Sequence, residues 1–162
     1  MAVEKLSSYR EPVRKSITVA CDSAHAFSVF TSGIARWWPL ATHSISTDRA
    51  RECVIEPRVG GGVYEVRDDG ERFAWGRVLA WEPPVRLVLS WHAGMPAELA
   101  QEVEVRFTPI AQGTRVDLEH RGWEALGPGA GDAHKGYNAG WESLFVKLFA
   151  AACAQPTTQP ST

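Results

Sequence analysis

The sequence predicts an α+β fold, in which helices cover one face of an antiparallel sheet and the other face meets solvent. Two observations carry this prediction. Apolar residues recur at helical spacing near the C-terminus, and apolar and polar residues alternate in most of the segments before it. The expected order is a strand, a helix, about six further strands and a long final helix.

A long helix is predicted over residues 134–152, because apolar side chains recur there at every third or fourth position. The stripe consists of Tyr137, Trp141, Leu144, Phe145, Leu148 and Ala152. Gly136 and Gly140 lie one turn apart in this helix, although each costs about 1 kcal/mol relative to alanine. We expect these glycines to let the helix backbone come close to a neighbouring surface.

Alternating patterns and turn signals predict strands over residues 13–21, 52–57, 63–68, 72–81, 85–92, 102–108 and 114–121. The side chains predicted to face the core are Val85, Leu87, Leu89, Trp91, Val103, Val105, Phe107, Val116 and Leu118. The acidic residues that alternate with them indicate a solvated outer face and comprise Glu102, Glu104, Asp117 and Glu119.

The first helix is expected to begin after an N-cap at Asp22 or Ser23 and to end at Pro39. One face of this helix carries Phe27, Phe30, Ile34 and Trp37. Residues 40–51 show no clear period, which predicts a loop with a short helical turn. The glycines at 60–62 lack the Lys-Ser/Thr ending of a phosphate-binding loop and predict a turn. Residues 127–131 are expected to form a flexible linker into the final helix.

Length and composition indicate one domain over residues 13–153, preceded by a flexible arm (1–12) and followed by a disordered tail rich in Pro, Thr and Gln (154–162). The net charge of -2 gives no reason to expect a nucleic-acid partner. Membrane insertion is not expected, since no apolar run is long enough and residues 1–10 are too polar for a signal peptide. Cys21, Cys53 and Cys153 lack metal-ligand spacing and favour reduced thiols in a cytoplasmic protein.

A series of short motifs resembles a known family. The motifs follow one another over residues 13–152. They are Trp37-Trp38-Pro39, Glu56-Pro57 with Gly60-Gly61-Gly62, Gly76-Arg77-Val78, Trp81-Glu82-Pro83-Pro84, Ser90-Trp91, Gly113-Thr114-Arg115-Val116 and Gly140-Trp141. In this order they resemble the START-like (SRPBCC) superfamily, in the branch named for the activator of the heat-shock-protein-90 ATPase. The resemblance implies a helix-grip fold, a curved antiparallel sheet wrapped around the C-terminal helix. About a dozen residues precede the first strand, whereas the eukaryotic co-chaperone carries a further N-terminal domain, so the name does not predict chaperone activation.

Six residues are candidates for a ligand site between the sheet and the final helix: Trp38, Trp75, Trp91, His120, Tyr137 and Trp141. His120 shares the inward face of its strand with Leu118, which predicts either a polar anchor for a ligand or a core-edge histidine bonded to backbone. Trp141 is expected to lie in the core, because Phe145 points the same way one turn later. Cys21 and Cys53 are expected to be buried, inert thiols.

No catalytic residues, metal site or cofactor are predicted, because the histidines are scattered and no acid–base pair can be identified. The resemblance implies a protein that binds a small hydrophobic molecule, since members of the superfamily carry lipids, sterols, polyketides or plant hormones. Other members are cyclases or hydrolases, which leaves open an enzyme acting on an aromatic or polyketide-like substrate with His120 as the acid–base group. A third possibility is an interaction module that regulates an ATPase or another protein through its outer sheet. The partner would then be another protein, and a homodimer is also left open.

Overall fold

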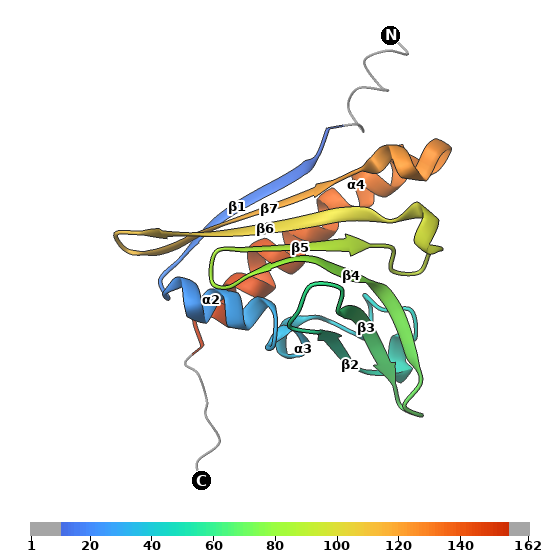
Figure 1. The fold of residues 1–162 in the computed structure, drawn as a ribbon, viewed down its shortest axis with the longest axis horizontal. Coiled ribbons are helices and arrows are strands. Elements are labelled where there is room, and N and C mark those ends of the chain that lie inside the picture. The colour runs from blue at the N-terminus through green and yellow to red at the C-terminus, as the bar shows by residue number, and fades with distance from the viewer. Residues whose placement is uncertain (1–10, 156–162) are drawn as a thin grey trace.

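Seven antiparallel strands form one curled sheet around the C-terminal helix in a computed structural model that describes residues 11–155 (Figure 1). The predicted arm over residues 1–12 and tail over residues 154–162 fall largely outside the described range. The strands are β1 (Val13–Val19), β2 (Ala50–Ile55), β3 (Gly62–Arg67), β4 (Arg72–Glu82), β5 (Arg86–Trp91), β6 (Gln101–Ile110) and β7 (Gly113–Arg121). Their order in the sheet is β1-β7-β6-β5-β4-β3-β2, which confirms the predicted fold class.

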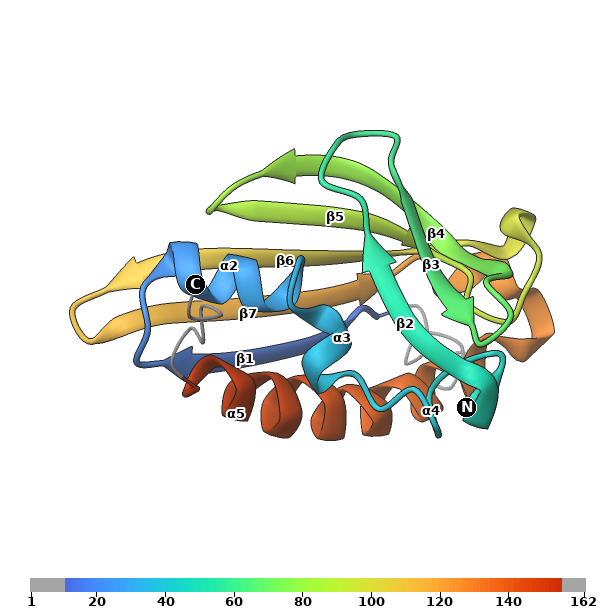
Figure 2. The ribbon, with the colours of Figure 1, turned by 90° about the horizontal axis from the view of Figure 1, so that it is seen from below.

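The curl of the sheet brings β2 and β3 round toward the same side as the C-terminal helix (Figure 2). The pairing register shifts within β4 on both sides, between Val63 and Tyr64 of β3 and between Val78 and Ala80 opposite β5. Such irregularities bend a strand and increase its twist.

The first helical segment consists of two pieces, α2 (Ser23–Phe30) and α3 (Ile34–Trp37), where one continuous helix was predicted. The Asp22 carboxylate caps α2 by accepting the His25 N–H at 2.8 Å, as expected. The break occurs because Thr31, the C-cap, leaves the helical conformation and its hydroxyl donates to the Phe27 carbonyl oxygen at 2.7 Å. Both pieces still bury the predicted apolar side chains Phe27, Phe30, Ile34 and Trp37.

The C-terminal helical segment runs through η3 (Trp123–Gly129), α4 (Ala130–Trp141), η4 (Glu142–Phe149) and α5 (Ala150–Cys153). The prediction of a linker at residues 127–131 was wrong, because these residues complete a 3₁₀ segment and begin α4. Only Gly127 departs from helical geometry there, with a φ of 57°. The helix thus starts earlier than its apolar stripe indicated.

Within η4 the helix adopts π geometry, which changes its buried face. Each residue of a π-helix advances less around the axis than in an α-helix. Phe149 is consequently buried against Phe145, with parallel rings 5.4 Å apart, whereas Leu148 is 39% exposed. The prediction that Leu148 belongs to the buried stripe was therefore wrong, and Phe149 takes that place.

The inner face of the sheet carries the predicted alternation. Its buried side chains include Leu87, Leu89, Trp91, Val103, Val105, Phe107, Val116 and Leu118. Val85 is the exception at 55% exposure. It lies in the turn between β4 and β5, where its N–H donates to the Glu82 carbonyl oxygen and the alternation of a strand no longer applies.

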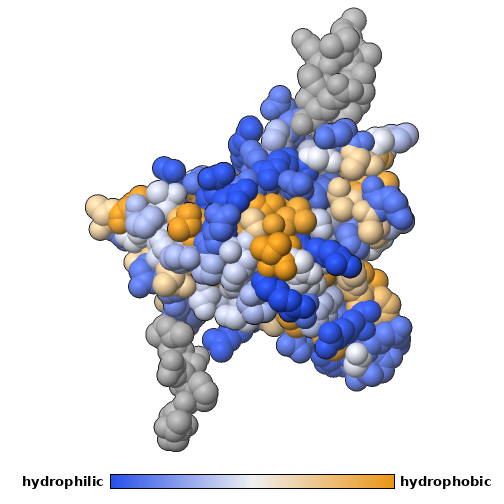
Figure 3. Space-filling model, viewed as in Figure 1, coloured by the Kyte–Doolittle hydropathy of each residue, from blue (hydrophilic) through white to orange (hydrophobic). Residues whose placement is uncertain are grey.

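The outer face of the sheet is largely hydrophilic, with an apolar patch near its centre (Figure 3). Glu104 on this face was predicted to be solvated, but only 8% of its side chain is exposed. Its carboxylate oxygens accept from Arg86 and Arg106 at 2.8 and 2.7 Å and also from Arg121. Three guanidinium groups thus surround the carboxylate. Burial alone would raise the pKa of Glu104, but these positively charged partners lower it below its ordinary value.

Candidate functional site

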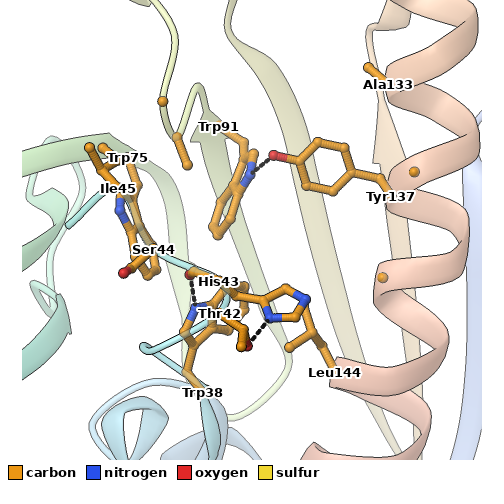
Figure 4. A pocket seen from close by; sticks show the side chains of 14 residues that line it. Trp38, Thr42, His43, Ser44, Ile45, Trp75, Trp91, Ala133, Tyr137 and Leu144 are labelled. Atoms are coloured by element: carbon orange, nitrogen blue, oxygen red, sulfur yellow. Dashed lines mark hydrogen bonds between the residues drawn. The ribbon is translucent and has the colours of Figure 1, made fainter. Parts of the chain in front are cut away.

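A pocket of about 580 Å³ opens between α4, strands β4 and β5, and the loop that follows α3 (Figure 4). Its size falls within the range of small-molecule sites. The lining residues are Trp38, Thr42, His43, Ser44, Ile45, Trp75, Trp91, Ala93, Gly94, Ala133, Gly136, Tyr137, Gly140 and Leu144. Most of them are apolar, and His43 and Tyr137 are the two that ionise.

Helix α4 forms one wall and presents small residues to the pocket. A Cβ atom added at Gly136 or Gly140 would meet no atom within 4 Å, so neither glycine serves a close approach between backbones. The prediction of close packing at these positions was wrong. Because they line the pocket, the missing side chains instead leave room beside the helix.

Three tryptophans form the opposite wall. The ring centroids of Trp38, Trp75 and Trp91 lie between 5.3 and 5.7 Å from one another. Each indole N–H is already used within the protein. Their acceptors, in the same order, are the His43 carbonyl oxygen at 2.7 Å, the Glu65 carboxylate at 2.7 Å and the Tyr137 hydroxyl oxygen at 3.0 Å. The wall therefore offers apolar ring surface to the pocket, not hydrogen-bond donors.

Glu65 on β3 is a fully buried carboxylate behind this wall. It accepts the N–H groups of Ile45 and Ser46 at 2.7 and 2.8 Å in addition to the Trp75 indole. Burial alone would raise the pKa of Glu65. The hydrogen bonds from these donors together have the larger effect, so the pKa lies below its ordinary value. The carboxylate thereby fixes both the loop and Trp75 at the edge of the pocket.

The loop over residues 39–46 supplies the polar part of the pocket, and it was not foreseen as part of the site. His43 is held by its backbone, since its N–H donates to the Pro39 carbonyl oxygen at 2.9 Å and its own carbonyl accepts from Trp38. The imidazole Nδ1 lies 2.8 Å from the Thr42 hydroxyl. Figure 4 shows the ring extending from the loop toward the C-terminal helix. The cluster of Thr, His and Ser at residues 42–44, shortly after Trp38, was the available signal in the sequence.

Tyr137 reaches from α4 across the pocket toward Trp91 (Figure 4). Its hydroxyl oxygen accepts the Trp91 N–H, and among residues 11–155 no hydrogen bond uses its hydroxyl proton. Burial raises the pKa of Tyr137, and the bond from Trp91 only partly offsets this. The phenol therefore remains protonated at neutral pH and can donate to a ligand.

His120 lies behind the pocket with none of its surface exposed. Its Nδ1 accepts the Trp141 indole N–H at 3.0 Å, so that its Nε2 carries the proton and donates to the Gln101 side-chain oxygen at 3.1 Å. The ring also stacks on Trp123, with centroids 4.2 Å apart. Burial, and to a smaller extent the charge of His134, lowers the pKa of His120 to about 3. Both ring nitrogens are thus satisfied by side chains of the core.

The pocket lining includes four of the six candidate residues, namely Trp38, Trp75, Trp91 and Tyr137. His120 and Trp141 contribute no lining surface. Trp141 is 1% exposed and belongs to the core, as expected from its place beside Phe145. It lies within about 6 Å of the Trp38 and Trp91 ring centroids and supports the wall from behind.

The three thiols offer no activated nucleophile. Burial, followed by the charges of Glu52 and Glu65, raises the pKa of Cys53 to about 12. Burial likewise raises the pKa values of Cys21 and Cys153. Within residues 11–155, no group of three or more His, Cys, Asp or Glu side chains could hold a metal ion. None of the helices in this part of the chain is both long and apolar enough to cross a membrane.

The chain is similar to known proteins over most of its length. The family model described as activator of Hsp90 ATPase homolog 1-like protein matches residues 21–152. A solved structure of an anthrahydroquino-gamma-pyrone synthase, Txn09, complexed with SUM is 36% identical, with a TM-score of 0.61, and the match covers 88% of this chain and 96% of that chain.

More distant structures share the fold. Protein MLL2253 from Mesorhizobium loti is 20% identical at a TM-score of 0.65, over 90% of this chain and 99% of that chain. The AHSA1-like protein from Aeromonas hydrophila is 18% identical at a TM-score of 0.59, over 87% and 90%. No curated protein matches the chain.

Proposed function

The chain belongs to the family of activator of Hsp90 ATPase homolog 1-like proteins, and we propose that its pocket binds a flat aromatic molecule of the polyketide class. The observation that carries the proposal is the pairing of a wall of three tryptophans with a helix that presents the small residues Ala133, Gly136 and Gly140 to the pocket. A flat ligand fits such a space, because one face of its fused rings can stack on the indoles while the other face lies against the small residues of the helix.

The polar groups of the pocket suit the same ligand class. Tyr137 can donate one hydrogen bond, and His43 offers an imidazole at the loop. Hydroxyl and carbonyl groups along the edge of an aromatic polyketide are natural partners for both. A saturated fatty chain, by contrast, would leave these groups unpaired once water is excluded.

The pyrone synthase among the relatives favours an enzymatic role over simple carriage. Its identity of 36% extends over 88% of this chain, well beyond a shared fold. We therefore infer that the chain promotes a ring closure in an aromatic polyketide-like substrate. The pocket would hold the reacting groups of one molecule together and exclude water from them.

Calorimetric titration tests the binding step. The probes are 1,2-dihydroxyanthraquinone and lauric acid, and the variants are Gly136→Leu and Asn138→Leu. A Cβ atom at Gly136 meets no atom within 4 Å and this residue lines the pocket, so a leucine there should occupy pocket space. Asn138 lies on the exposed face of the same helix and controls for the added leucine.

We expect wild type and Asn138→Leu to bind the anthraquinone equally well and to prefer it over lauric acid. Gly136→Leu should bind it at least about 10-fold more weakly, since each 1.4 kcal/mol of lost contact is a factor of ten. Equal binding by all three proteins would place the ligand elsewhere. Preference for lauric acid would support a lipid carrier and overturn the proposal.

A further inference from the structure

We propose that His43 and Tyr137 are the proton acceptor and the proton donor of a ring closure in this pocket, in which a phenol of the substrate adds to a carbonyl group of its own side chain. The inference rests on the proposed function and assigns catalytic residues to it. Sequence reasoning gave His43 no role, and it gave Tyr137 only a role in binding.

The pocket contains few side chains that can exchange a proton with a substrate. Among its fourteen lining residues, His43 and Tyr137 are the two that ionise. His120, which the enzyme alternative from the sequence named as the acid–base group, lines none of the pocket and has both ring nitrogens engaged by Gln101 and Trp141. His43 and Tyr137 are therefore the lining side chains best suited to proton transfer with a bound substrate.

The Thr42 hydroxyl orients the imidazole of His43, whose Nδ1 lies 2.8 Å from the hydroxyl oxygen. A hydroxyl can donate or accept in such a contact, and our assignment places the proton on Nδ1, which then donates to the Thr42 oxygen. In this tautomer Nε2 carries the lone pair, which makes His43 a base oriented by a neighbouring group.

The hydroxyl of Tyr137 is positioned as a proton donor. Its oxygen accepts the Trp91 N–H at 3.0 Å, which fixes the phenol and leaves the hydroxyl proton for a ligand. A donor held in this way stabilises negative charge as it develops on a carbonyl oxygen. The higher pKa that burial gives the phenol keeps this proton in place at neutral pH.

The loop that carries the base is fixed before a ligand arrives. The His43 N–H and the Ser44 hydroxyl bond back to Pro39 and Leu40, and the Trp38 indole binds the His43 carbonyl. Glu65 holds the next two residues through their N–H groups. A base positioned in this manner loses little conformational freedom when the substrate binds.

The reaction balances without any further reagent. The phenol proton passes to Nε2 of His43 as the phenol oxygen bonds to the carbonyl carbon, and the carbonyl oxygen takes the Tyr137 proton. The protonated His43 then returns its proton to the new hydroxyl, which leaves as water, while the neighbouring carbon gives a proton back to Tyr137. When the side chain is a 1,3-diketone beside the phenol, the product is a fused γ-pyrone plus one water. Neither oxidant nor reductant is consumed.

The test uses an anthracene that bears a 1,3-diketone side chain next to a hydroxyl group. Ring closure is followed by the absorbance of the pyrone, and binding of the finished pyrone is measured separately by calorimetry. The variants are His43→Gln and Tyr137→Phe, with His25→Gln and Tyr64→Phe as matched controls outside the pocket. Thr42→Val and Thr42→Ser test the orientation of the base.

We expect His43→Gln and Tyr137→Phe each to slow ring closure by about 100-fold or more, while pyrone binding changes only a few-fold. Thr42→Val should slow it as well, and Thr42→Ser should restore the rate because serine keeps the hydroxyl. Wild type that binds the pyrone without accelerating the reaction would overturn this assignment and leave the binding proposal standing, as would undiminished rates in both variants. Failure of wild type to bind either compound would overturn the proposed function itself.

Discussion

Two histidines of this chain illustrate, at the scale of single residues, how surroundings decide chemistry. His120 has no exposed surface and exchanges hydrogen bonds with Gln101 and Trp141, so it remains neutral down to about pH 3. His43 lies on an exposed loop, and its Thr42 neighbour leaves one nitrogen free. The same side chain is thus a structural group in one place and a candidate base in the other.

The buried His120 makes folding stability depend on pH. Its pKa is about 3 in the folded state and near 6.5 in the unfolded chain, so the unfolded chain binds one more proton between these values. The contribution of the neutral His120 to the unfolding free energy should therefore be fully present above pH 6.5 and should be lost as the pH falls toward 3. In His120→Gln this contribution is absent, and the slope of unfolding free energy against pH should be shallower by up to about 1.4 kcal/mol per unit. Urea unfolding at several pH values measures it, and parallel slopes in both proteins would contradict the assignment.

At the scale of elements, the C-terminal helix does two jobs with two geometries. Its first half, α4, is regular and lines the pocket with Gly136 and Gly140. Its second half, η4, is a π-helix whose aromatic side chains fill the core beside α2. The helix thus leaves room for the pocket along α4 and fills the core along η4.

The π geometry predicts opposite costs for two adjacent truncations. Phe149→Ala should lower the unfolding free energy by about 3–5 kcal/mol, since the ring is fully buried and contacts Phe30, Trp37 and Phe145. Leu148→Ala should cost less than about 1 kcal/mol, because Leu148 is partly exposed at the surface. Denaturant unfolding of both variants checks this. A regular α-helix with Leu148 in the core would reverse the order.

The glycines of α4 predict a gain in stability at the site itself. Gly136→Ala should raise the unfolding free energy by about 0.5–1 kcal/mol, because alanine favours the helix and its methyl group meets open space. Gly113→Ala provides the contrast. That residue has a φ of 143° and its added Cβ would collide with the Val19 carbonyl oxygen, so the variant should be destabilised. Thermal unfolding that showed a loss at Gly136 would mean the helix packs against something there.

The elements and their inner faces were largely predictable from sequence, because alternation and helical spacing record which side of each element is buried. Three errors have local causes. Val85 lies in a turn and Leu148 lies in a π-helix. Glu104 is enclosed by Arg106 of its own strand and by Arg86 and Arg121, which the register of β5 and β7 brings beside it. None of these features has a short-range pattern in the sequence.

At the scale of the whole molecule, the pocket exists because four segments meet that lie far apart in the chain. Trp38, Trp75, Trp91 and Tyr137 come from a loop, two strands and a helix, and sequence reasoning identified all four as aromatic wall candidates. It missed Thr42 and His43, since a loop without periodicity gives no direction for its side chains. It left His120 open between an anchor for the ligand and a core-edge histidine, because alternation shows that a side chain points inward but not what lies in front of it.

The most direct measurement follows the indole N–H signals of the seven tryptophans by ¹⁵N NMR during titration with 1,2-dihydroxyanthraquinone. We expect the signals of Trp38, Trp75 and Trp91 to shift, because a ring stacked in the pocket lies against their indoles. Those of Trp37, bonded to the Val29 carbonyl, and Trp81, packed on Phe27, should stay in place. Shifts confined to tryptophans outside the pocket, or no shifts at all, would contradict the account that this pocket binds a flat aromatic molecule.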